Sequence, residues 1–366
     1  MPSSAVKANP TLLREVVEVT GGVDTHLDTH LDTHTVAALD QVGGLLGCAT
    51  FPATPAGYAA VLAWLGSHGP LGRVGVEGTG SYGAGLARFL TGAGVTVIEV
   101  SRPNRADRRT RGKSDPLDAE NAARAVLAGT ATGQPKTRTG IVEAIRALHT
   151  TRRGAVKART AASNQFAGLL VSAPEPLRAQ LRPLPKAQRL ATAAAYRPGD
   201  LTDPTQATKR ALQRLARRIS VLDTEIADAD ADLADLTARA APQLLAEFGV
   251  GPDSAAQLLI TVGDNPDRLA TAASFAAVCG TSPVPASSGK TTRHRLNRGG
   301  DRQANRALHM ILLSRLRRDP ETRAYVERAT ARGKTRRDAM RALKNYIARS
   351  LHRVLCDTVL NPPITT

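Results

Sequence analysis

The chain has 366 residues, which is enough for two domains with sizeable cores and excludes a single small module. Its 49 Lys and Arg outnumber 32 Asp and Glu, and the resulting formal charge of +17 favours a polyanionic partner. Aromatic residues make up only 3%, so base stacking can be at most a minor mode of nucleic-acid binding.

The cysteines and the apolar runs indicate a soluble cytoplasmic protein. Cys48, Cys279 and Cys356 stand singly, which argues against a disulfide framework or a Cys-based zinc site and fits a reducing compartment. No apolar run approaches the roughly 18 residues of a membrane span, and residues 1–10 lack the hydrophobic core of a signal peptide. We therefore expect no membrane partner.

The first part of the chain has the element order of a mixed α/β domain. Three strand-like stretches separated by Gly and Asp turn signals predict an antiparallel meander, at 16–19, 35–39 and 45–51. Helices and strands then alternate, with helices expected at 55–68, 82–91 and 116–128 and strands at 73–77 and 95–100. The order βββαβαβα is that of an RNase H-like domain, which we place at residues 12–130.

Residues 141–240 are helical in composition, with breaks at the proline-rich stretch 174–185 and at 198–204. Apolar residues then recur at alternating steps of three and four, as in a heptad repeat: Leu212, Leu215, Ile219, Leu222, Ile226, Ala229, Leu233 and Leu236. The repeat predicts a coiled-coil arm. It fits a seam within one helical hairpin and a seam between subunits equally well, so both interpretations stay open.

Residues 241–360 are expected to form a basic, mostly helical C-terminal domain that begins with a helix-turn-helix-like segment. Between residues 281 and 350 there are 18 Lys or Arg against 5 Asp or Glu, whereas ordinary solvated helix faces mix the signs more evenly. This excess predicts a nucleic-acid surface whose phosphate contacts supply affinity rather than sequence choice. The expected contact residues are Lys290, Arg293, Arg295, Arg298, Arg302 and Arg306.

Four acids of the first domain could converge on one site. Asp115 and Asp118 lie three apart at the start of an expected helix, Glu77 ends a strand, and Asp24 ends the first strand. Mg²⁺ requires oxygen ligands, and two such ions about 4 Å apart stabilise the attacking and leaving oxygens of a phosphodiester displacement. Singly, each acid could be a surface or capping carboxylate, with Asp115 as a helix N-cap. Together they predict a centre for two Mg²⁺ ions, with no organic cofactor.

A dinucleotide site is the competing interpretation of the same region. Residues 78–83 form a literal G-x-G-x-x-G between a strand and a helix, and Glu99 ends the next strand about 20 residues on. Against this, the preceding strands form a meander, Glu77 occupies the strand end, and the Asp pair and the basic region stay unexplained. We therefore prefer the metal centre.

An Asp-Thr-His triplet occurs three times in residues 24–34. The spacing of four places His26, His30 and His34 on one side of either a strand or a helix, so a zinc or nickel site is conceivable. A hairpin extended by duplication is the preferred interpretation, because no flanking fold fixes the geometry of the three imidazoles.

Five short motifs, in this order, closely resemble those of the DEDD transposases of bacterial insertion sequences, and the resemblance covers nearly the whole chain. They lie at 22–26, 75–82, 113–119, 286–289 and 297–301. The resemblance implies a RuvC-like N-terminal domain, a C-terminal transposase domain that carries a serine, and a recombinase guided by a structured bridge RNA.

The resemblance also implies roles for particular residues. Asp24, Glu77, Asp115 and Asp118 match the metal ligands, and Ser288, directly before a glycine, matches the nucleophile. Ser287 is chemically as good a hydroxyl, but the family places its serine directly before the glycine.

The first motif departs from the family, which usually has two Asp-Thr-His-like units where this chain has three. Anchoring on the first strand makes Asp24 the first acid, whereas anchoring on the second strand makes it Asp28. An insertion of four preserves strand parity. We favour Asp24 because Gly22 and Val23 precede it as a buried strand end.

These observations predict an insertion-sequence transposase or recombinase of the bacterial cytoplasm, which cuts and rejoins DNA through a phosphoserine intermediate. The expected partners are DNA, as element ends and target, and a guide RNA that selects the target by base pairing. A dimer or tetramer is expected because each exchanged strand needs its own active site. The alternatives are a structure-selective nuclease with the same acids and water as nucleophile, and a nucleic-acid-binding protein without catalysis.

Overall fold

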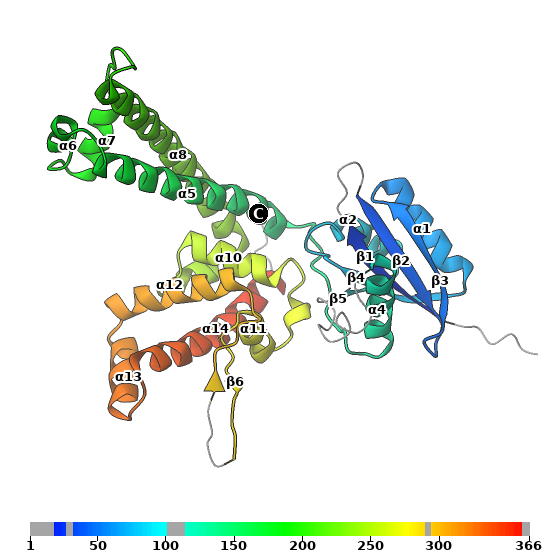
Figure 1. Ribbon diagram of the computed structural model, residues 1–366. Helices are drawn as coiled ribbons and strands as arrows, with labels where there is room; N and C mark the ends of the chain where they lie inside the picture. The colour runs from blue at the N-terminus through cyan, green and yellow to red at the C-terminus, as the bar shows by residue number, and fades with distance from the viewer. Residues whose placement is uncertain (1–17, 27–31, 101–113, 290–293, 361–366) are drawn as a thin grey trace, which may run out of the picture. The chain divides into compact units, whose positions relative to one another are not determined.

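The computed structural model describes residues 18–26, 32–100, 114–289 and 294–360 (Figure 1). The chain divides into two compact units, residues 1–137 and 138–366. The first unit is mixed α/β and the second is mostly helical, as the sequence predicts. No helix in the described ranges is both long and apolar enough to cross a membrane.

A five-stranded mixed sheet forms the centre of the first unit, in the order β3-β2-β1-β4-β5 (Figure 1). The strands are β1 (Val19–His26), β2 (Thr33–Leu39), β3 (Leu45–Pro52), β4 (Leu71–Glu77) and β5 (Thr96–Val100). The first three pair antiparallel as the predicted meander, β4 pairs parallel with β1, and β5 pairs parallel with β4.

Helices cover both faces of this sheet. One face carries α1 (Pro55–Ser67) and α2 (Ala84–Gly92), whose apolar side chains share a core with alternate residues of β1 and β4. The other face carries α4 (Asp115–Leu127), which packs over β1, β2 and β4. Successive residues of each strand therefore point alternately toward α1 and α2 and toward α4. The candidate acids lie on the α4 face.

The first strand differs from the prediction, because it begins at Val19 and continues through Gly21 and Gly22. A Cβ atom at Gly22 would lie well under 3.0 Å from backbone atoms of α4, and one at Gly75 would lie 2.7 Å from Val126 Cγ2. Gly22 and Gly75 are therefore buried strand residues that let α4 lie directly on the sheet.

The second unit contains a long helical hairpin, formed by α5 (Ile141–Val171) and α8 (Pro204–Ala240) and closed at its tip by α6 (Glu175–Leu181) and α7 (Lys186–Ala194) (Figure 1). Ion pairs of Arg152 with Asp230 and of Arg159 with Asp223 show that the two long helices run antiparallel.

The heptad seam of α8 packs in part within the chain. Leu212 and Ile219 are buried with α5, α6 and α7 residues, and Leu233 is buried with the C-terminal core. Leu222 and Ile226 are half-buried. A contact between subunits through these partly exposed members stays a prediction.

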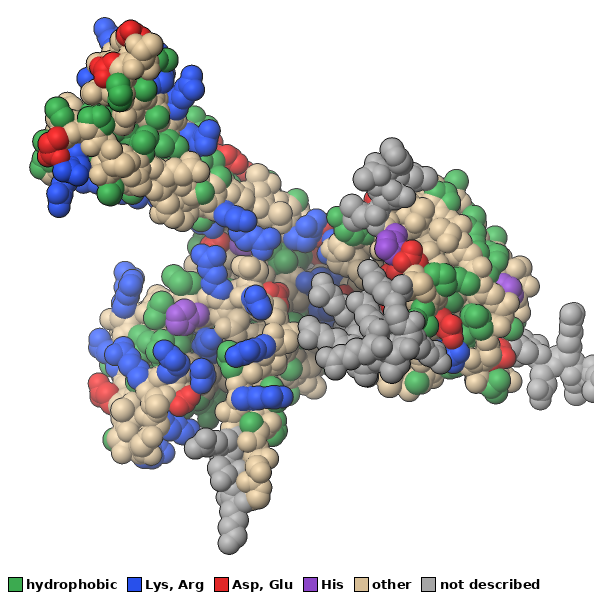
Figure 2. All heavy atoms as spheres, in the orientation of Figure 1, with side chains coloured by type: hydrophobic (Ala, Val, Ile, Leu, Met, Phe, Trp, Pro, Cys, Tyr) green, Lys and Arg blue, Asp and Glu red, His purple; other side chains and the backbone are tan. Residues whose placement is uncertain are grey.

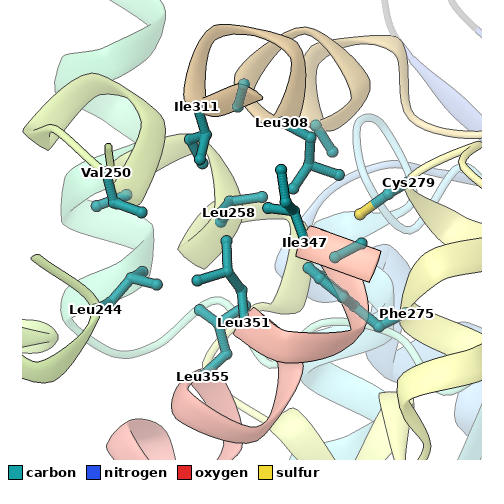
Figure 3. Packing of buried hydrophobic residues seen from close by; sticks show 14 of the residues in the cluster. Leu244, Val250, Leu258, Phe275, Cys279, Leu308, Ile311, Ile347, Leu351 and Leu355 are labelled. Carbon is teal, nitrogen blue, oxygen red and sulfur yellow. The ribbon is translucent and has the colours of Figure 1, made fainter. Parts of the chain in front are cut away.

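The rest of the second unit packs around one apolar core (Figure 3). Its elements are α9 (Pro242–Ala246), α10 (Pro252–Val262), a 3₁₀ turn (Pro266–Leu269), α11 (Ala272–Val278), β6 (Val284–Pro285), β7 (His294–Arg295), α12 (Arg302–Arg318), α13 (Pro320–Ala331) and α14 (Arg336–Leu360). Leu258, Phe275, Leu308 and Leu351 are fully buried. The strands β6 and β7 pair antiparallel within this mostly helical part of the chain.

Candidate metal centre and nucleic-acid surface

The sheet register places Asp24 and Glu77 side by side. Val23 pairs with Val76, so the next residues of β1 and β4, Asp24 and Glu77, lie next to each other. Glu77 ends β4 as expected, whereas the expectation that Asp24 ends the first strand is wrong, because β1 continues to His26. Asp24 lies two residues after Gly22, and Glu77 lies two residues after Gly75, and both glycines face α4. Because residues two apart in a strand share a face, both acids lie on the face of the sheet that α4 covers.

The first turn of α4 brings the other two acids to the same place. Asp115 is the first residue of the helix, and the N-cap is Ser114, so the capping role considered for Asp115 is wrong. Asp118, one turn on, is 2% exposed. The positive end of the helix dipole favours negative charge at both positions.

Asp24, His26 and Asp115 form a compact group of donors whose ligand atoms all lie within 4.8 Å of one another. His26 Nε2 contacts Asp115 Oδ1 and lies 3.7 Å from Asp24 Oδ2. Burial raises the pKa of Asp24, the nearby His26 opposes this, and the carboxylates of Asp118 and Asp115 raise it further. A cation bound among these groups would relieve the repulsion between the carboxylates.

The donor set fits a divalent metal ion. Carboxylate oxygens are the ligands that Mg²⁺ prefers, and the imidazole nitrogen of His26 also suits Mn²⁺, Co²⁺ or Zn²⁺. Asp24, Asp115 and Asp118 interact electrostatically, and the strand register places Glu77 next to Asp24 in the sheet. Sequence reasoning did not place His26 with the acids, although it lies two residues after Asp24 and therefore on the same strand face.

The strands that carry the triplets pair antiparallel, as the preferred hairpin interpretation expects. The alternative, with the histidines on one side, is wrong for His26 and His34, because His34 pairs with Thr25 and lies on the face opposite His26. Its ring lies 5.6 Å from that of Tyr58 in α1, its Nδ1 is 3.0 Å from Thr25 Oγ1, and burial lowers its pKa. His30 and Asp28 lie outside the described residues.

The glycine loop at 78–83 follows β4, as the dinucleotide interpretation requires, but Glu99 forms a hydrogen bond with the loop itself. Glu99 pairs with Val76, on the face covered by α1 and α2, and its Oε1 accepts a hydrogen bond from Thr79 Oγ1 at 2.9 Å. This carboxylate therefore braces the loop, which is a structural role.

Both candidate serines lie in the second unit, whereas the acids lie in the first. Ser287 and Ser288 follow β6 and are exposed. Gly289 has φ +55°, a left-handed backbone conformation that residues with a side chain disfavour. This conformation explains why a glycine follows Ser288 directly.

Basic side chains gather on the second unit, over α12 to α14 (Figure 2). Arg295 lies on β7, Arg298 follows it, and Arg302 and Arg306 lie in the first turns of α12. Arg295, Arg298 and Arg302 are at least partly exposed, as is Arg306. Lys290 and Arg293 lie outside the described residues. The acid of the last motif, Asp301, caps α12 by accepting hydrogen bonds from the backbone N–H groups of residues 303 and 304.

Comparison with known families places both units among transposases. A family model of DEDD transposases of the IS110 type, described as "Transposase", matches residues 26–173. A second model, described as "Transposase IS116/IS110/IS902 family", matches residues 242–327. The chain therefore belongs to the IS110 family of transposases. The first match begins after Asp24 and includes Asp28.

Two curated relatives come from insertion elements. The uncharacterized 42 kDa protein of insertion element IS900 from Mycobacterium paratuberculosis is 33% identical over 156 residues, which are 42% of this chain and 39% of that protein. The uncharacterized 43.6 kDa protein of insertion element IS110 from Streptomyces coelicolor is 38% identical over 117 residues, 32% of this chain and 29% of that protein. The matches thus span less than half the length of either relative.

Proposed function

We propose that this protein is a Mg²⁺-dependent DNA transposase that acts as a recombinase, cutting and rejoining DNA through a phosphoserine intermediate. The observation that carries the proposal is the convergence of Asp24, Glu77, Asp115 and Asp118 on one face of the sheet, at the start of α4. Family membership supports DNA as the substrate.

The first unit is an RNase H-like, RuvC-like catalytic domain in this proposal. Support comes from the strand order β3-β2-β1-β4-β5, with only β2 antiparallel to its two neighbours, and from the adjacent positions of Asp24 and Glu77 on the parallel strands β1 and β4. The arm at residues 141–240 and the transposase domain at 241–360 complete the proposed organisation.

The four acids would hold two Mg²⁺ ions, with His26 as a further donor to one of them. Bound metal supplies charge neutralisation on the phosphate and stabilises the attacking and leaving oxygens. The chain itself positions its ligands through the register of β1 with β4 and through the packing of α4 on Gly22 and Gly75.

Ser288 is the proposed nucleophile. Its Oγ forms a bond to phosphorus while one bridging P–O bond of the phosphodiester breaks, and the hydroxyl proton is transferred, through solvent, to the departing oxygen. Because the ester with serine conserves the energy of the broken bond, the reverse attack by a DNA hydroxyl rejoins the strand without an external cofactor.

The basic second unit would bind nucleic-acid backbone, and a structured guide RNA would select the target by base pairing. Exposed arginines such as Arg302 support phosphate contacts, which carry no sequence information directly. A dimer or tetramer would supply one active site for each exchanged strand.

A structure-selective nuclease is the second candidate. It is favoured by one observation, that all four acids belong to the first unit while Ser288 lies in the second. In that case water attacks the phosphodiester, and the products are one DNA end with a terminal phosphate and one with a hydroxyl, which cannot be rejoined without an external energy source.

Trapping of a protein–DNA adduct separates the two candidates. The protein is incubated with Mg²⁺, the DNA that flanks its gene and RNA transcribed from that DNA, and the products are resolved on denaturing gels. A covalent adduct is expected with wild type and with Ser287→Ala and is absent with Ser288→Ala. Cleavage by wild type without any adduct would contradict the phosphoserine step and favour the nuclease.

A further inference from the structure

A cavity of about 720 Å³ opens in the second unit, beside the hairpin that leads to Ser288. Residues 280–283 and 294–297 form one wall, and the first half of α14 forms the other. Its volume lies within the range of about 300–1,000 Å³ that is typical of ligand pockets. The two walls are far apart in sequence.

The lining is strongly basic. Five Lys or Arg side chains line the cavity, namely Arg295, Lys334, Arg341, Lys344 and Arg349. The single acid of the lining, Asp338, accepts hydrogen bonds from Arg341 at 3.0 Å and from Thr335 at 2.6 Å. In the described part of the chain, no carboxylate forms an ion pair with Lys344 or Arg349.

Lys344 is the best-held cation of this cavity. Its Nζ donates a hydrogen bond to Asn305 Oδ1 at 2.8 Å, and Asn305 Nδ2 donates in turn to the carbonyl oxygen of Cys279 at 2.9 Å. Burial and the nearby Arg341 lower the pKa of Lys344. A half-buried ammonium with a neutral partner and a cationic neighbour is stabilised by an anion.

The cavity also contains an exposed aromatic side chain. Tyr346 is 59% exposed, and it is the only Phe, Trp or Tyr among the described residues that line the cavity. Its ring packs edge-on against Tyr325, with centroids 6.0 Å apart, which restrains the ring. An aromatic ring beside Lys and Arg is typical of sites where a base stacks while its phosphate is neutralised.

We propose that this cavity binds one unpaired nucleotide of a single-stranded nucleic-acid segment, with its phosphate at Lys344 and Arg349 and its base against Tyr346. The inference rests on the proposed function in so far as nucleic acid is the substrate. In this proposal α14 binds the unpaired nucleotide, whereas Arg298, Arg302 and Arg306, which follow β7, contact the nucleic-acid backbone elsewhere.

Binding of fluorescein-labelled oligonucleotides to the full-length protein, followed by anisotropy, tests the site without any cleavage step. The probes are one sequence as single-stranded DNA, as single-stranded RNA and as blunt DNA duplex. Lys344→Gln and Arg349→Gln should each weaken single-strand binding about tenfold and lower the salt dependence by about one phosphate contact. The matched control Arg328→Gln, on α13 outside the cavity, should weaken it no more than about twofold.

The aromatic part of the proposal has its own variants. Tyr346→Leu should weaken single-strand binding at least about fivefold and leave duplex binding unchanged, whereas Tyr346→Phe should bind as wild type. Melting curves confirm that each variant is folded. The expected contact also predicts that an oligonucleotide with 5-bromouracil crosslinks to the tryptic peptide of residues 345–349.

Two negative results have different meanings. If wild type binds single strands but the cavity variants match Arg328→Gln, the cavity proposal is overturned and the proposed function stands. If wild type binds neither DNA nor RNA, the proposed function itself fails.

Discussion

The packing of α4 on the sheet can be tested by Gly22→Ala. The new methyl group would meet backbone atoms of Ala119 and Ala123 well under 3.0 Å, and backbone cannot turn away as a side-chain tip can. Overpacking costs about 1–3 kcal/mol, and the rigid neighbours place this substitution at about 3 kcal/mol. At about 4 °C per kcal/mol for a unit of this size, its melting temperature should fall by about 12 °C.

The single tryptophan of the chain provides the assay. Trp64 lies in α1 of the first unit, so its fluorescence follows the unfolding of that unit. Melting is recorded with and without Mg²⁺, and the stabilisation by Mg²⁺ should shrink in Gly22→Ala because displacement of α4 moves Asp115 and Asp118.

Gly66→Ala is the matched control, because Gly66 lies in α1 and a methyl group added there would meet no neighbouring segment or side chain within 4 Å. Its melting temperature should be unchanged or slightly raised, since alanine has the higher helix propensity. An unchanged melting temperature and Mg²⁺ response in Gly22→Ala would refute the argument that the glycine sets the position of α4.

Three further predictions concern single side chains. His26→Gln should remove the imidazole nitrogen coupling from pulsed EPR spectra of bound Mn²⁺, whereas His68→Gln should keep it; coupling that persists without His26 excludes it as a ligand. Burial raises the pKa of Asp24, so the folded protein loses stability as the pH rises from the unfolded pKa through the raised folded pKa. Asp24→Asn should therefore raise the melting temperature of the metal-free protein at neutral pH, whereas Asp28→Asn should leave it unchanged. A rise with Asp28→Asn and none with Asp24→Asn would make Asp28 the first acid. The hydrogen bond with the buried His149 lowers the pKa of Asp253. The contribution of Asp253 to the stability of the fold is therefore present above the unfolded pKa of about 3.9 and is lost as the pH falls through the folded pKa. Asp253→Asn should therefore lower the urea midpoint at pH 7 more than at pH 3, and equal losses would contradict this.

The positions of three of the acids in the fold could be predicted from sequence because each has a local signal. Asp115 and Asp118 open a helix and Glu77 ends an apolar strand, and these signals depend on short segments. The direction in which His26 and His34 point depends on the reversal between β1 and β2, which a repeat spacing alone does not contain.

Other features depend on tertiary packing and could not be predicted locally. The packing explains why two successive residues of β1 are glycine: a Cβ atom at Gly22 would meet the backbone of α4, and one at Gly21 would crowd Leu65 of α1 on the opposite face. The strands β6 and β7 have two residues each, too few for a period of two to be recognised. The cavity forms only when residues 280–283 and 294–297 meet α14.

The central claim, that the acids beside α4 form one catalytic metal centre, is tested most directly by Mg²⁺-dependent cleavage of the DNA that flanks the gene. Asp118→Asn is compared with Glu120→Gln, a substitution on the same helix of an acid that pairs with Arg124. The account predicts that Asp118→Asn binds DNA as wild type but does not cleave it, while Glu120→Gln cleaves normally. Full cleavage by Asp118→Asn would contradict the metal centre.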